Sequence, residues 1–131
     1  MPLRLKTTNR KIHYWGSIAI ALPLAVVLVS GILLLLKKDL AWIQPPTASG
    51  EQSGITLSFD EILSIAGTVR EAGIETWKDV DRVDVRPGKG VLKVRASNSW
   101  EVQIDANSGA ILQVAYRRSD VIESIHDGSF F

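Results

Sequence analysis

A long run of apolar residues dominates the first third of the chain. Residues 14–36 contain no charged side chain. Because a helix rises 1.5 Å per residue and pairs its own backbone groups, about 20 such residues can cross a hydrocarbon core of about 30 Å. The alternative, a secretory signal peptide, has an apolar run of about 7–15 residues followed by a cleavage site of small residues. The run here is longer and ends at the charged residues 37–39, so we predict a transmembrane helix over residues 14–36.

Basic residues flank this predicted helix unequally. The segment before it, residues 1–13, carries four, and the segment just after it carries two: Arg4, Lys6, Arg10, Lys11, Lys37 and Lys38. Basic residues are retained on the cytoplasmic side of a membrane. We therefore predict a cytoplasmic basic segment over residues 1–13 and a carboxyl-terminal part on the other side of the bilayer.

Several residues in and near the apolar run bear on anchoring and helix packing. Trp15 and Trp42 lie near its two ends, as interfacial aromatic residues do. Pro23 lacks an N–H and can kink a helix. Ser30 and Gly31 offer a small face on which a second helix could pack closely, although such residues are also ordinary in membrane helices. The run therefore predicts contact with the lipid bilayer and with another integral membrane protein.

The composition changes after the apolar run. Residues 37–54 are rich in Pro, Gly and Ser, which favours an extended start at Pro45-Pro46 and a flexible remainder. We interpret this stretch as a linker. The next signal is a capping box, in which Ser58 and Glu61 satisfy each other's backbone N–H groups. Apolar residues then recur at helical spacing, so we predict a helix over residues 59–72.

The period of the pattern changes to two after this helix. Four short runs alternate apolar and polar residues and are separated by turn sequences; they lie near residues 82–86, 92–96, 100–105 and 111–116. Alternation of this kind, with tight turns, is typical of an antiparallel meander. We predict an α+β domain over residues 55–118, with the helix covering the apolar face of about four strands. Residues 119–131 are predicted to form a short helix and tail.

The opposite face of the predicted sheet carries charged side chains. The first strand carries Arg82, Asp84 and Arg86, the second carries Lys93 and Arg95, and the third carries Glu101, Gln103 and Asp105. Opposite charges on neighbouring strands stabilise their pairing by about 0.2–1 kcal/mol per pair. These residues are therefore interpreted as cross-strand pairs, and the alternative is a binding face for a partner.

Charge and chemistry restrict the classes of function. Beyond Asp39 the chain has nine basic and thirteen acidic residues, which argues against binding to nucleic acid. The absence of cysteine excludes disulfides, thiolate metal sites and cysteine nucleophiles. Only His13 and His126 could act as general bases near neutral pH or as haem ligands. Since no catalytic set is evident, we predict a protein that is not an enzyme, with no metal and no required cofactor.

The order of these motifs resembles the PepSY family. A strand that ends in Asp105, the turn residues 107–109 and a further strand are similar to a PepSY domain. Residues 11–16, followed by Ser30-Gly31, resemble the start of the membrane-associated branch of that family, and residues 119–131 look like its entry into a second membrane helix. The resemblance implies a bacterial inner membrane protein with a periplasmic PepSY domain, here in a short or truncated form.

Three functions follow from the helix and the resemblance. The first is a non-catalytic accessory, assembly or regulatory subunit of an inner-membrane complex. The second is a haem-linked redox subunit related to PepSY-type iron reductases, in which His13 or His126 supplies one ligand. The third is a membrane-tethered regulator or inhibitor of a periplasmic peptidase.

Overall fold

The computed structural model describes residues 2–52 and 54–131, and the side chains from Lys6 onward. Met1 and Ser53, which fall in the predicted basic segment and linker, lie outside the described residues. The chain divides into two compact units. The helix unit comprises Met1–Leu36 and Val121–Phe131, and the sheet unit comprises Lys37–Asp120.

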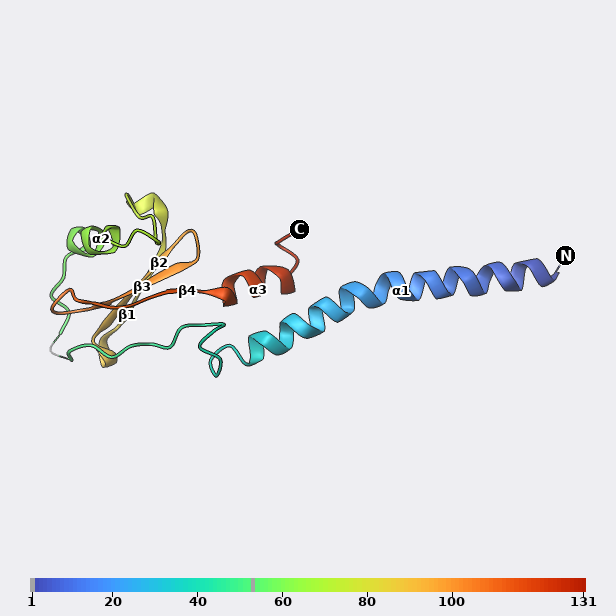
Figure 1. Cartoon of the computed structure of the whole chain (residues 1–131), viewed down its shortest axis with the longest axis horizontal. Helices are drawn as coiled ribbons and strands as arrows, with labels where there is room; N and C mark the ends of the chain where they lie inside the picture. The colour runs from blue at the N-terminus through green and yellow to red at the C-terminus, as the bar shows by residue number, and fades with distance from the viewer. Residues whose placement is uncertain (1, 53) are drawn as a thin grey trace. The chain divides into compact units, whose positions relative to one another are not determined.

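The helix unit is built on α1 (Pro2–Leu35), drawn in blue to cyan in Figure 1. The most apolar 18 residues within its segment Lys6–Leu35 have a mean hydropathy of 2.9, and the segment is apolar and long enough to cross a membrane. Only 6% of its most apolar window is buried, so α1 is not a core helix of this chain. The helix extends through the basic segment that precedes residue 14. The second element of this unit comes from α3 (Arg118–His126), which begins in the sheet unit and ends in the helix unit.

The sheet unit contains α2 and a sheet of four antiparallel strands in the order β1-β2-β3-β4, which confirms the predicted α+β class. The elements in chain order are α2 (Phe59–Gly67), the 3₁₀ helix Trp77–Asp79, β1 (Val80–Arg86), the 3₁₀ helix Pro87–Lys89, β2 (Val91–Ala96), β3 (Trp100–Asp105) and β4 (Ile111–Tyr116). Each strand pairs with the next along the chain, as tight turns require.

The capping box at the start of α2 is formed as predicted. The Ser58 N–H donates to Glu61 Oε2 at 2.7 Å, and the Glu61 N–H donates to Ser58 Oγ at 3.3 Å. The helix ends at Gly67, earlier than the predicted residue 72. The Thr68 N–H bonds the carbonyl of Ile65 at 3.1 Å, and its hydroxyl bonds the same carbonyl at 2.6 Å. These bonds tighten the last turn and end the α-helix.

One face of the sheet packs against α2 and the turns that follow it. The largest buried side chains on this face are Leu92, Val94, Val102 and Ile104, each at most 1% exposed. Ile62 of α2 and other apolar residues complete the cluster, namely Ala66, Val69, Ala72, Ile74, Ala96 and Ala106. The apolar period of two along β2 and β3 therefore forms the core of the sheet unit.

The other face of the sheet is covered by the chain's own residues 43–51, here called the covering segment. Gln103 of β3 accepts from the Ala48 N–H at 2.7 Å and donates to the Pro46 carbonyl at 2.9 Å. The Glu51 N–H donates to Asp105 Oδ2 at 2.6 Å. The prediction of a flexible linker over residues 37–54 is therefore wrong for the covering segment. In Figure 1, α2 and this teal segment lie on opposite sides of the sheet.

Asp105 provides a test of this attachment. Backbone N–H groups of Ser108, Glu51 and Asn107 donate to its carboxylate and lower its pKa to about 2. An aspartate with a depressed folded pKa stabilises the folded state above its unfolded value near 4, and this contribution is lost as the pH falls towards 2. We expect Asp105→Asn to reduce the loss of stability between pH 5 and pH 2.5. The urea midpoints of the two full-length proteins at both pH values measure this, and equal losses would contradict it.

Candidate docking site on helix α1

Within the helix unit, the end of α3 contacts the last third of α1. His126 Nδ1 lies 3.0 Å from Ser30 Oγ and 3.1 Å from the carbonyl oxygen of Val27. Since a carbonyl oxygen only accepts, Nδ1 must carry a proton in this geometry. The Ser30 hydroxyl donates to the Val26 carbonyl at 2.7 Å. Ser30 is 5% exposed, so the contact satisfies a buried hydroxyl.

The absence of a side chain at Gly31 permits this approach. A Cβ placed there would lie 3.2 Å from His126 Cε1 and 3.6 Å from its Nδ1. The small face formed by Ser30 and Gly31 was predicted to receive a helix from another membrane protein. In this structure the face receives His126 of the same chain. A partner helix would therefore have to use a surface beside this contact.

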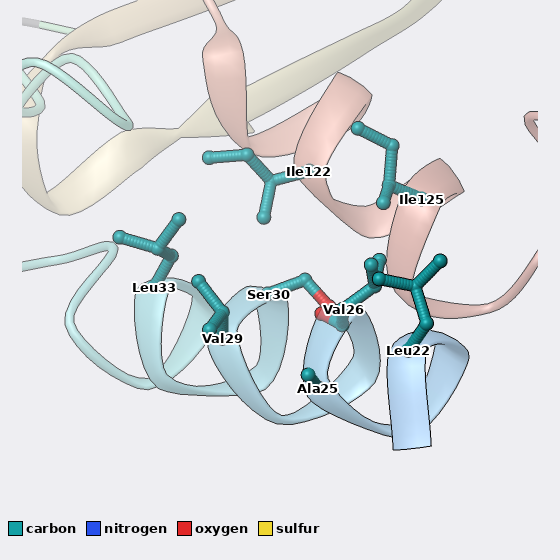
Figure 2. A pocket seen from close by; sticks show the side chains of 8 residues that line it. All are labelled: Leu22, Ala25, Val26, Val29, Ser30, Leu33, Ile122 and Ile125. Carbon is teal, nitrogen blue, oxygen red and sulfur yellow. Dashed lines mark hydrogen bonds between the residues drawn. The ribbon is translucent and has the colours of Figure 1, made fainter. Parts of the chain in front are cut away.

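An apolar groove of about 390 Å³ lies beside the contact, between α1 and α3. Figure 2 shows the eight side chains that line it: Leu22, Ala25, Val26, Val29, Ser30, Leu33, Ile122 and Ile125. Ser30 is the one polar residue in this lining, and its hydroxyl already bonds within the chain. The groove is therefore suited to an apolar occupant. A second cavity of about 450 Å³ is lined in part by Pro23, Val27 and Phe131.

The two tryptophans predicted to lie at the membrane interfaces belong to different units. Trp15 is on α1, is 65% exposed, and contacts the Tyr14 ring edge-on. Trp42 is in the sheet unit, where the Arg118 guanidinium lies 5.2 Å from the centre of its ring. Arg118 also donates to the Trp42 carbonyl at 3.2 Å, so Trp42 anchors the start of α3.

The two histidines proposed as haem ligands do not form one site. His13 lies on α1, and its Nδ1 is 3.2 Å from Ser17 Oγ. His126 packs at Val27, fourteen residues further along the same helix, which is about 21 Å at 1.5 Å per residue. One iron therefore cannot bind both side chains. Among the described residues, no group of three His, Asp or Glu side chains is arranged to hold a metal ion.

The charged face predicted as a partner surface is divided by the covering segment. Arg82 and Asp84 lie 3.6 Å apart on β1 with side chains 53% and 35% exposed, and Arg86 is exposed. Lys93 and Arg95 on β2 have side chains that are only 6% and 14% exposed. Opposite-charge pairing occurs in part, because Asp84 faces Lys93, but Arg82 faces Arg95. The five residues therefore do not form one open binding face.

The predicted pairing of opposite charges between the second and third strands occurs between Lys93 and Glu101, but its burial in an ionic network under the covering segment was not predicted. The carboxylate of Glu101 is 2.8 Å from Arg117 Nη1 and 3.7 Å from Lys93 Nζ, and Gln103 donates to it at 2.9 Å. Glu101 is 1% exposed and Arg117 is 7% exposed. The only sequence signal for this network was the set of charged residues at alternate positions of β2 and β3. That pattern does not show that the residues are covered.

Asp120 extends the network into the first turn of α3. Its Oδ1 lies 3.3 Å from Arg117 Nε and 3.9 Å from Arg95 Nη1. The Ser119 N–H donates to the carbonyl of Ile43 at 2.9 Å. The start of α3 and the covering segment are therefore held by the same part of the sheet unit.

Within residues 2–52 and 54–131, the chain has one candidate membrane-spanning helix and a small α+β domain. No family model, no curated protein and no solved structure matches this chain. Membership of the PepSY family therefore stays a hypothesis based on the motifs described above.

Proposed function

We propose that this protein is a non-catalytic accessory subunit of a membrane-protein complex. The helix α1 anchors it, and the groove between α1 and α3 binds one apolar transmembrane helix of a second protein. By its resemblance to the PepSY family, the complex is assigned to a bacterial inner membrane and the sheet unit to the periplasm. The observation that carries the proposal is the apolar groove beside the contact of His126 with Ser30.

The chemistry of the groove supports an apolar helix as its occupant. Leu22, Val29 and Leu33 line one side, and Ile122 and Ile125 line the other. Helices in lipid associate through close packing, since hydrocarbon tails and apolar side chains are equally apolar. A groove with small Ala25 in its lining gives the packed contact area that such an association needs.

A bulky residue in the groove tests this proposal. We expect Ala25→Phe to lower association with the partner about tenfold or more, because overpacking of a fitted interface costs about 1–3 kcal/mol. The measurement is the native mass of the full-length protein extracted from its own membrane in mild detergent. Ala19→Phe is the matched control, because Ala19 lies on α1 and lines neither cavity.

A second experiment identifies the occupant of the groove by placing a photo-crosslinking residue at position 25. A crosslink to an apolar segment of a second protein supports the proposal if an excess of wild-type chains abolishes it and an excess of Ala25→Phe chains does not. A crosslink to lipid alone would mean that acyl chains fill the groove. If the native mass equals that of two identical chains, the groove serves self-association, and the proposed accessory role is wrong.

A further inference from the structure

A polar cavity of about 420 Å³ lies in the sheet unit, apart from the groove on α1. Four of its lining residues are cationic: Lys38, Arg86, Lys89 and Lys93. They come from the segment after α1, the end of β1, the turn that follows it, and β2. No acidic residue is among the lining residues. The wall opposite the strands includes Pro45-Pro46 of the covering segment, whose backbone is restricted by the two prolines.

Lys93 is the buried cation of this cavity. It is 5% exposed, and its Nζ lies 3.7 Å from Glu101 Oε1, which is beyond hydrogen-bond distance. The other oxygen of Glu101 is held by Arg117 at 2.8 Å. Burial lowers the pKa of Lys93, and the positive charges of Arg117 and Arg86 lower it further, while Glu101 and Asp84 oppose this. Glu101 is therefore shared between two cations, and its ion pair with Lys93 is the longer of the two.

One residue that lines the cavity follows the end of α1 closely in the sequence. Lys38 follows Leu35, the last residue of α1, by three residues. Three residues span at most about 11 Å, so Lys38 lies near the boundary between hydrocarbon and headgroups where the helix ends. Phosphate groups are the abundant anions at that boundary, and Arg and Lys bind phosphate oxygens by charge-assisted hydrogen bonds.

We propose that this cavity binds a phosphate group and that its source is the headgroup of an anionic phospholipid. Arg86 and Lys89 are exposed, so their side chains contact an incoming phosphate first. Lys93 forms its inner end, where a bound phosphate adds a second negative charge to that of Glu101, which Lys93 shares with Arg117. Lys38, from the segment that follows α1, completes the site.

The test uses the full chain in detergent free of phosphate, with short-chain phosphatidylglycerol as the probe and zwitterionic phosphatidylcholine, which has no net charge, as the comparison. Bound lipid is counted by native mass spectrometry. We expect saturable binding of phosphatidylglycerol that the double variant Arg86→Gln/Lys89→Gln weakens by roughly 30-fold, from about 1 kcal/mol per basic residue. The matched control is Arg70→Gln/Lys78→Gln, which removes the same charge from exposed positions outside the cavity. Because Arg86 and Lys89 are exposed, the variant is expected to fold, and its urea midpoint verifies this.

Each outcome decides a part of the proposal. Binding that prefers phosphatidylglycerol, and that only the cavity variant weakens, supports the lipid site. If inorganic phosphate binds in the same concentration range and displaces the lipid completely, the phosphate chemistry stands and the lipid source is overturned. Equal loss in the control variant would overturn the site altogether. Equal binding of phosphatidylcholine, whose headgroup also carries a phosphate, would overturn the choice of an anionic lipid.

Discussion

Replacing Glu101 by alanine is expected to lower the free energy of unfolding by about 3–5 kcal/mol, because it removes the buried carboxylate that pairs with two buried cations. Arg117 Nη1 is 2.8 Å from this carboxylate, and Lys93 Nζ is 3.7 Å from it. A loss of this size approaches the whole stability of many small domains. The measurement is urea unfolding of the full chain in mild detergent, followed by tryptophan fluorescence.

The control for this prediction is Glu71→Ala. Because Glu71 is exposed, this substitution is expected to change the free energy of unfolding by no more than about 0.5 kcal/mol. A second variant separates the cost of an unpaired charge from the value of the pair. Replacing Glu101, Lys93 and Arg117 together by apolar residues of similar volume should restore most of the stability. If Glu101→Ala and the control have the same free energy of unfolding, the network is not a determinant of stability.

The second large effect is expected at Gly90, in the turn before β2. Gly90 has a φ of +60°, and a Cβ there would collide with the carbonyl group of Glu51 in the covering segment. We expect Gly90→Ala to cost about 1–3 kcal/mol through backbone strain alone, and to displace the covering segment in addition. Amide exchange at Ala48 and Glu51 should accelerate, because their N–H groups donate to Gln103 and Asp105 across this contact.

Gly88 in the same turn gives a matched control. A Cβ at Gly88 would meet no atom within 4 Å, and its φ is not in the left-handed region. Gly88→Ala should therefore leave both the urea midpoint and the exchange of Ala48 and Glu51 unchanged. If Gly90→Ala also leaves the exchange unchanged, the covering segment does not depend on close approach at Gly90.

Local patterns predicted the elements of the sheet unit well, because strands and caps depend on neighbouring residues. The capping box at Ser58 and Glu61 requires residues three apart, and the strands follow a period of two. The end of α2 was misjudged because Val69 and Ala72 continue the helical spacing of apolar residues. They are buried in turns that follow the helix, and spacing alone does not distinguish these two arrangements.

The parts that the sequence did not reveal depend on contacts between distant residues. Pro, Gly and Ser in residues 37–54 indicate an extended chain, but the partners that fix it, such as Gln103, lie 55 residues away for Ala48. The same applies to the site on α1. Ser30 and Gly31 were identified as a small face, whereas their neighbour His126 is 96 residues away from Ser30.

This long separation sets an order of events during synthesis. The contact of Ser30 with His126 closes a loop of 96 residues that contains the whole sheet unit. Loops of that length close late, and domains generally fold in the order in which they are synthesised. We expect α1 to enter the bilayer first and the sheet unit to fold next, so that Ile122 and Ile125 complete the groove last. A partner that recognises the groove would then bind only chains whose sheet unit has already folded.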